Sequence, residues 1–170
     1  MESDRSSKKN FEDGRNNTDY LSTTSAADPL TVLDKFGSEQ IVMITLAVEP
    51  RHTRTGHLEK KGQWIKSVWQ LVLSAMPEIQ GCRLSWNTLF FIAASRELES
   101  VGEQFQEILK SVYDSDLVSF CVLSEAEGAP NVKLMQLDRM LGEISTARNF
   151  GSDAGFQYRL LDGADWLPKT

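Results

Sequence analysis

The sequence predicts a mixed α+β domain with a mainly antiparallel sheet. Three observations support this fold class: a continuous apolar run over residues 41–48, three later segments whose apolar residues recur at helical spacing, and short apolar stretches of strand length between them. Their order is strand, helix, two strands, helix, strand, helix and a last short strand. A β-α-β-β-α-β core is the ferredoxin-like arrangement, here with an additional C-terminal helix. We expect its helices to pack on one face of the sheet.

The first strand and the first helix are the clearest elements. Residues 41–48 are rich in β-branched side chains and the run ends at Pro50, which indicates a buried central strand. A polar loop over residues 51–55 leads to a helix expected over residues 58–76, which Pro77 ends. The apolar residues of this helix fall on one face at a spacing of 3.6 residues: Trp64, Ile65, Val68, Trp69, Val72 and Leu73.

The rest of the core begins with an apolar stretch over residues 83–94. The polar pair Asn87-Thr88 interrupts it, which favours two strands joined by a tight turn. A helix, a strand, a helix and a short strand are then expected over residues 101–113, 117–123, 132–146 and 156–161. The apolar stripes of the two helices are Val101, Phe105, Ile108, Leu109 and Val112 in the first, and Leu134, Leu137, Leu141 and Ile144 in the second.

The domain organisation follows from length and composition. The chain of 170 residues has room for one domain and a tail. Residues 1–27 are rich in Ser, Asn, Asp, Lys, Arg and Thr and lack apolar periodicity, so we expect a disordered polar tail. Residues 28–170 form the single predicted domain.

Charge and composition disfavour several classes of function. A net charge of −6 and a pI near 5.0 provide no counterion-release affinity, so we expect no nucleic-acid partner. The polar start has no hydrophobic signal segment and no apolar run approaches the roughly 18 residues of a membrane span, so a cytoplasmic protein is expected. Cys82 and Cys121 lie in apolar segments and are interpreted as reduced core thiols. His52 and His57 are interpreted as polar loop residues rather than metal ligands.

Four short segments occur in an order that matches one known family. The segment 28–33 (Asp-Pro-Leu-Thr-Val-Leu) is similar to an opening D-x-L-T-G-L signature, with Val32 in place of the glycine, and Gly56-His57 resembles a G-H pair before the first helix. The segment 83–90 aligns with an R-x-G-G-D-E-F hairpin, and Asp138 with the segment 147–149 resembles an A-D…G-R-N pattern. Over residues 28–160 the chain thus resembles the GGDEF (diguanylate cyclase) family, which implies a nucleotide-cyclase-like fold.

The resemblance implies a nucleotide-cyclase reaction, and the residues that differ from the family pattern imply that this chain has lost it. An active GGDEF domain joins two GTP molecules into cyclic di-GMP as a dimer, with Mg²⁺ held by carboxylates. Here Ser85-Trp86-Asn87-Thr88-Leu89 stands where the family has Gly-Gly-Asp/Glu-Glu-Phe, and Ala47-Val48-Glu49 offers one carboxylate in place of D-x-D. The family's product-binding Arg-x-x-Asp corresponds to Met76-Pro77-Glu78-Ile79, which has no Arg. We therefore expect no catalytic residue, no cofactor, no metal ion and no enzymatic activity.

These features favour a degenerate GGDEF domain that acts as a non-catalytic regulatory or protein-interaction module. Trp86 and Asn87 form the candidate interaction hairpin, although Trp86 could instead fill the former cleft. The resemblance implies a bacterial source and a protein partner in a cyclic-di-GMP-linked, secretion or exopolysaccharide system, and it leaves a homodimer open. Three alternatives stay open: a sensor that binds GTP or cyclic di-GMP at a non-standard site, an enzyme with altered chemistry, and an unrelated ferredoxin-like binding domain.

Overall fold

The computed structural model describes residues 28–50, 57–85, 87–94, 97–111, 117–150 and 156–163, together with Trp166. The predicted polar tail lies outside these residues. The expected strands and helices are all present, and the element bounds are α2 (Pro29–Asp34), β2 (Ile41–Pro50), α3 (His57–Ala75), β3 (Gln80–Ser85), β4 (Thr88–Ala94), α4 (Leu98–Ser111), β5 (Leu117–Ala126), α5 (Pro130–Phe150) and β6 (Phe156–Leu160).

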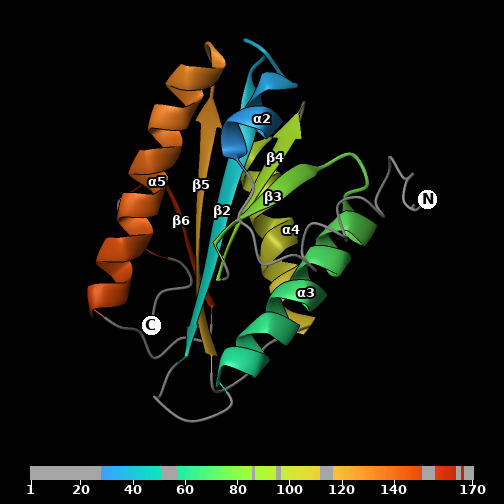
Figure 1. Cartoon of the computed structure of the whole chain (residues 1–170), viewed down its shortest axis with the longest axis vertical. Helices are drawn as coiled ribbons and strands as arrows, with labels where there is room; N and C mark the ends of the chain where they lie inside the picture. Colours follow the sequence, from blue (N-terminus) through green and yellow to red (C-terminus); the bar gives the residue numbers. More distant parts are fainter. Residues whose placement is uncertain are drawn as a thin grey trace, which may run out of the picture.

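The sheet is mainly antiparallel, as predicted. Its strand order is β3-β4-β2-β5-β6, and only β6 runs parallel to its neighbour β5 among the described strands. Strand β2 is central in the sheet, between β4 and β5 (Figure 1). At one end of the sheet, Ile41 lies opposite Ala94 and Ala126. At the other end, Ala47 lies opposite Thr88 of β4, so the β3–β4 turn lies beside the end of β2.

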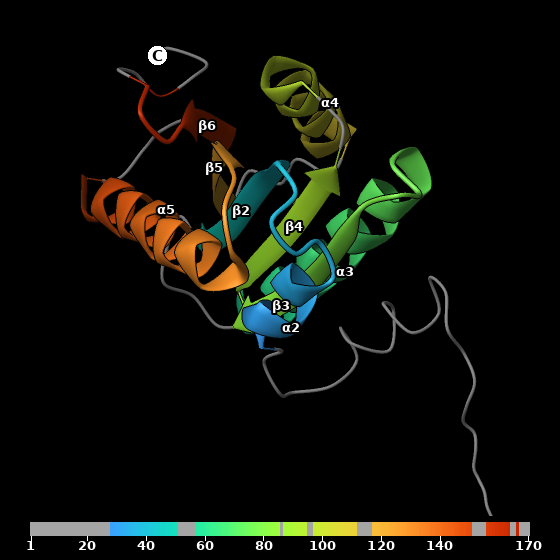
Figure 2. The same ribbon diagram turned by 90° about the horizontal axis from the view of Figure 1, so that it is seen from above.

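Helices cover both faces of the sheet, which corrects the expectation that they pack on one face. Figure 2 shows α3 and α4 on one side and α2 and α5 on the other. Two separate hydrophobic clusters result, one between the sheet and α3 with α4, and one between the sheet and α5 with α2. The chain reaches the second face through α2, which precedes the sheet, and through α5, which connects the parallel strands β5 and β6.

The composition of β2 follows from this two-sided burial. Successive side chains of a strand point to opposite faces. Val42, Ile44, Leu46 and Val48 therefore belong to the cluster under α3, whereas Ile41, Met43 and Ala47 belong to the cluster under α5. A strand buried on both faces needs apolar residues at nearly every position, so the run is continuous rather than alternating.

The short helix α2 is an element that the sequence pattern did not predict. Asp28 caps it, because its carboxylate accepts a hydrogen bond from the backbone N–H of Leu30 at 3.0 Å, and Pro29 occupies the first helical position. Val32 and Leu33 are buried in the cluster under α5. The segment that resembles an opening family signature is thus a capped helical turn that packs on the domain.

A buried lysine joins α5 to the turn after α2. The side chain of Lys133 is 0% exposed, and its ammonium donates to the backbone carbonyls of Gly37 at 2.9 Å and Glu39 at 2.5 Å. Gly37 has φ +54°, a conformation that favours glycine and turns its carbonyl within the tight turn before β2. The two hydrogen bonds therefore fix the entry of the chain into the sheet.

Both cysteines are buried thiols, and we expect them to be unreactive in the folded protein. Burial raises the pKa of Cys82 from 9.0 to about 12, with a smaller contribution from Asp28, and burial raises the pKa of Cys121 further. Since the thiolate is the nucleophile, a rise of three units lowers its population about a thousandfold. Iodoacetamide at pH 8 should label neither thiol until guanidinium unfolds the chain, as measured by mass spectrometry. Rapid labelling of the native protein would contradict this burial.

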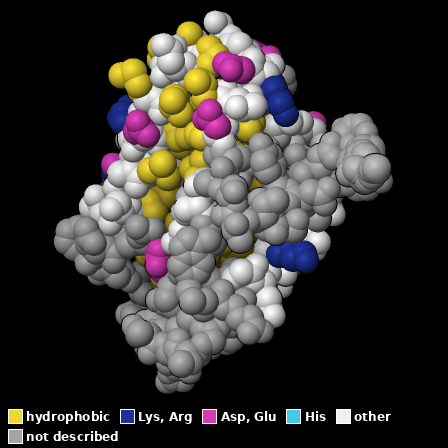
Figure 3. All heavy atoms as spheres, in the orientation of Figure 1, with side chains coloured by type: hydrophobic (Ala, Val, Ile, Leu, Met, Phe, Trp, Pro, Cys, Tyr) yellow, Lys and Arg dark blue, Asp and Glu magenta, His cyan; other side chains and the backbone are white. Residues whose placement is uncertain are grey.

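The surface is mixed in character. Figure 3 shows apolar side chains on the upper part of α5 and where α5 meets α2, with acidic side chains among them. The exposed large apolar residues in the described part of the chain are Leu71, Val132 and Met135. Among the described helices, none is both long and apolar enough to cross a membrane.

Candidate functional site

The β3–β4 turn and the end of β2 form one hydrogen-bonded unit. The backbone N–H of Val48 donates to the carbonyl of Asn87 at 3.0 Å, just beyond the last ladder pair between Ala47 and Thr88. The β3–β4 pairing is irregular between Arg83 and Ser85, which changes the register immediately before the turn. The turn is therefore held against β2 rather than projecting freely.

Asn87 is the centre of this unit. Its amide nitrogen donates to the Glu49 carboxylate at 2.7 Å and to the Val48 carbonyl at 3.3 Å. Its amide oxygen accepts from the hydroxyls of Ser85 at 2.7 Å and Thr88 at 3.2 Å. Two donors and two acceptor sites are the full capacity of an amide side chain, so Asn87 is completely satisfied.

The network also fixes the orientation of the Asn87 amide. The nitrogen faces two oxygen atoms that can only accept, and the oxygen faces two hydroxyls that can donate. A carboxylate in the same place would face the Val48 carbonyl and the Glu49 carboxylate, both of which repel it. The local geometry therefore suits an amide and disfavours an acid unless a cation intervenes.

The chemical capacity of this unit is limited. Glu49 supplies the carboxylate, and the Asn87 amide nitrogen occupies one of its oxygens. Among the described residues, no three His, Cys, Asp or Glu side chains gather in a way that could hold a metal ion. Mg²⁺ prefers several hard oxygen ligands in near-octahedral geometry, often carboxylates, and Glu49 is the one carboxylate among the described residues of this unit.

The structure brings together two of the sequence-predicted residues. Asn87 of the candidate hairpin and Glu49 of the first strand are in direct contact, whereas Trp86, His52 and Gly56 lie outside the described residues. Sequence reasoning did not assign the hydroxyls of Ser85 and Thr88 to this network. Serine and threonine flanking an asparagine at a turn are the signal that could have suggested it.

Residues 76–79, which the resemblance aligns with the family's product-binding site, are buried at their first and last positions and exposed at the two between. Met76 is 0% exposed and Ile79 is 1% exposed, so the first and last positions of this stretch point inward. Met76 packs in the cluster under α3. This stretch therefore has apolar packing positions where a phosphate-binding site would need an exposed cation.

Trp166, near the C-terminus, contacts the sheet face that carries the α5 cluster. The ring of Trp166 lies edge-on to Phe120 of β5, with ring centroids 5.8 Å apart. Trp166 therefore packs on the domain. Phe120 lies opposite Ala47 in the sheet, next to the strand end that contacts the hairpin turn.

Comparison with known proteins supports the fold through solved structures. No protein-family model matches the sequence, and no curated protein matches it. The GGDEF domain of DgcB from Caulobacter crescentus, in complex with c-di-GMP, has a TM-score of 0.55 at 12% identity and covers 80% of this chain and 86% of that domain. The diguanylate cyclase SiaD from Pseudomonas aeruginosa, in complex with its activator SiaC, has a TM-score of 0.57 at 12% identity over 86% of this chain and 66% of that chain. The chain therefore has the fold of a GGDEF domain, as the resemblance predicted.

Proposed function

We propose that this GGDEF-fold chain is a non-catalytic regulatory module that binds a protein partner through the interaction hairpin of Trp86 and Asn87, in which Trp86 contacts the partner and Asn87 holds the turn in place. The observation that supports the proposal is the closed hydrogen-bond network of Asn87. It joins the hairpin to the Glu49 carboxylate with a neutral amide, at the point where phosphoryl-transfer chemistry would need carboxylates and a cation.

The electrostatics of the hairpin support this proposal. Catalysis of phosphoryl transfer depends on positioning the phosphates and neutralising their developing charge. Ser85, Asn87 and Thr88 carry no charge, and the two hydroxyls donate to the Asn87 amide oxygen. Such a unit keeps the turn in place without a metal ion and leaves it suited to a structural or contact role.

A protein partner agrees with the precedent among the structural neighbours. SiaD is a diguanylate cyclase whose solved structure contains an activator protein, SiaC. Tryptophan is enriched among residues that dominate interface energy, which favours Trp86 as the anchor of a contact. The proposed partner belongs to a cyclic-di-GMP-linked system, and the first partner to test is a diguanylate cyclase encoded in the same genome.

The catalytic half of the proposal predicts that the purified chain makes no cyclic di-GMP. Incubation with GTP and either Mg²⁺ or Mn²⁺, followed by mass spectrometry, should give no product above a control without protein. An active diguanylate cyclase assayed in parallel shows that the conditions are adequate. Product formation that disappears in Glu49→Gln would establish an active metal site and overturn the proposal.

The interaction half is tested by measuring the activity of the candidate cyclase with and without this chain. The wild-type chain should change the rate of cyclic di-GMP formation, and Trp86→Ala should abolish that effect. Leu71→Ala is the matched control, because Leu71 is an exposed apolar residue on α3. Calorimetry with GTP and cyclic di-GMP distinguishes the proposal from the alternative of a nucleotide sensor. Tight nucleotide binding would favour a sensor over a protein-binding module.

A further inference from the structure

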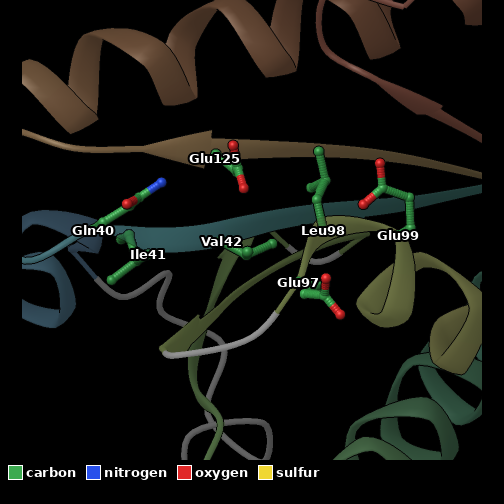
Figure 4. A pocket seen from close by; sticks show the side chains of 7 residues that line it. All are labelled: Gln40, Ile41, Val42, Glu97, Leu98, Glu99 and Glu125. Carbon is green, nitrogen blue, oxygen red and sulfur yellow. The ribbon is translucent and has the colours of Figure 1, made fainter.

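A groove lies at the end of the sheet opposite the hairpin. It consists of two adjoining pockets of about 400 and 500 Å³ that share Leu98 of α4 and Glu125 of β5, and we call it the Leu98 groove. Figure 4 shows the first pocket, in which the side chain of Leu98 extends toward β5. Gln40, Ile41 and Val42, at and just before the start of β2, also line this pocket. About seven strand residues separate Ile41 from the hairpin contact, which corresponds to roughly 20 Å.

The groove exists because β5 is longer than its neighbour β6. Strand β6 ends at Leu160, which lies opposite Leu123, so residues 124–126 of β5 extend beyond it. The chain then turns: Leu161 donates its N–H to the Leu123 carbonyl at 2.8 Å. With α4 beginning at Leu98, a recess is left between the end of β5, the start of α4 and the side of α5.

Apolar residues form the floor of the groove. Leu123 and Val42 are buried, and Leu98 and Leu160 are half-buried with part of their surface facing the recess. These leucines join the same cluster that packs under α3 and α4. A ligand with an apolar side chain can therefore bury surface here, which is the usual source of affinity in a concave site.

The rim of the groove is acidic. Among the described residues that line it, the carboxylates are Glu97, Glu99, Glu125, Glu127 and Asp162. Among these described lining residues, the one guanidinium is that of Arg139, which pairs with Asp162 at 3.0 Å. The described residues of the lining thus carry a net charge of −4, so carboxylates outnumber cations among them at this end of the sheet.

Two simpler roles do not account for these acids. Glu97 and Glu99 lie at the start of α4, where carboxylates offset the helix dipole, but Glu125 and Asp162 are on other elements. Within the described part of the chain, no three acidic, histidine or cysteine side chains are close enough to hold a metal ion. The four glutamates are instead spread around an apolar floor, so each can meet a different cationic group, whereas Asp162 already pairs with Arg139.

We infer that the Leu98 groove binds a basic segment of a protein partner. Lysine or arginine side chains would pair with the rim carboxylates, and an apolar side chain between them would contact Leu98 and Leu160. The charge of the rim and the apolar floor together select this occupant, because a purely apolar segment would leave the carboxylates desolvated and unpaired. The described lining of the groove contains no residue of the hairpin. A negative result for peptide binding at the groove would therefore leave the proposed function of the hairpin untested, and the reverse also holds.

The test uses the full chain and a fluorescein-labelled peptide, Lys-Leu-Lys-Leu-Lys-Lys, in an anisotropy titration at low and physiological salt. Changing Glu97, Glu99 and Glu125 to glutamine should weaken binding about tenfold or more, because three opposing charges are removed. The matched control changes Asp34, Glu103 and Glu107 to Asn, Gln and Gln, which alters the net charge equally at exposed positions outside the groove. This control should change the affinity by less than about threefold.

Two further variants keep the test decisive. Glu125→Lys on β5 leaves the start of α4 unchanged and should weaken binding even if the triple variant is destabilised. Leu98→Ala should weaken binding of the leucine peptide but not of a Lys-Ser-Lys-Ser-Lys-Lys peptide. Equal losses in the groove and control triple variants, or equal affinity for the two peptides, would overturn the inference in favour of non-specific charge attraction. Displacement of the peptide by equimolar spermine would overturn it in favour of a small polycation.

Discussion

Replacing Lys133 with alanine is expected to lower the free energy of unfolding by about 3 kcal/mol. The aliphatic stem of Lys133 is fully buried, so truncation leaves a cavity between α5 and the turn after α2. The carbonyls of Gly37 and Glu39 also lose their ammonium donor. Urea unfolding followed by circular dichroism measures the change, and hydrogen exchange should show faster exchange in α2 and the turn that follows it.

Two controls separate the cavity from the hydrogen bonds. Lys133→Met keeps most of the side-chain volume and removes the donor, so we expect about half the loss of the alanine variant. Lys110→Met removes an exposed lysine that pairs with Glu107 at 3.1 Å, and it should change stability by less than about 0.5 kcal/mol. If Lys133→Ala costs no more than Lys110→Met, the turn is not held by this lysine.

The pH dependence of the Lys133 variants has a defined sign. Burial lowers the pKa of Lys133 below 10.5, and the nearby Glu39 opposes this shift. Between the lowered folded-state pKa and 10.5, the unfolded chain binds more protons than the folded chain, so the stability of the wild type rises with pH. Lys133→Met lacks this contribution, and its deficit relative to the wild type should therefore grow as the pH approaches 10.5.

The sequence contained the signal for a second helical layer, although helices were expected on one face. An antiparallel sheet with one covered face alternates apolar and polar residues, but residues 41–48 are apolar at nearly every position. Both faces of β2 therefore had to be covered. The helix α2 gave no such signal, because six residues span fewer than two turns and cannot show helical periodicity.

The hairpin network could be predicted only in part. Glu49 and Asn87 were each identified from the sequence, but they are 38 residues apart and meet only because Ala47 pairs with Thr88. A one-residue change of register would turn these side chains to opposite faces, and apolar patterning alone does not fix register that finely at a strand end. Lys133 could not be identified at all, because its partners are backbone carbonyls whose positions depend on the tertiary fold.

Replacing Asn87 with aspartate is expected to lower the free energy of unfolding by about 2 kcal/mol in the absence of divalent cations. The new carboxylate would face Glu49 and the Val48 carbonyl, where the amide nitrogen now donates hydrogen bonds at 2.7 and 3.3 Å. Asn131→Asp is the matched control, because Asn131 is exposed in the first turn of α5, where a negative charge is tolerated or mildly favourable. Thermal unfolding with EDTA measures both variants.

The same variant connects the network to the proposed loss of chemistry. Millimolar Mg²⁺ or Mn²⁺ should restore part of the stability of Asn87→Asp and leave the wild type unchanged, because a cation can screen two adjacent carboxylates but adds nothing to a satisfied amide.

Adding Glu49→Gln to Asn87→Asp should also restore stability, since the amide introduced on β2 can then donate to the carboxylate introduced in the turn. Neither variant should make cyclic di-GMP, because one pair of oxygen ligands does not assemble a site for a metal-bound triphosphate. If Asn87→Asp is as stable as the wild type in EDTA, or if Glu49→Gln does not rescue it, then the contact between these two side chains does not hold the hairpin.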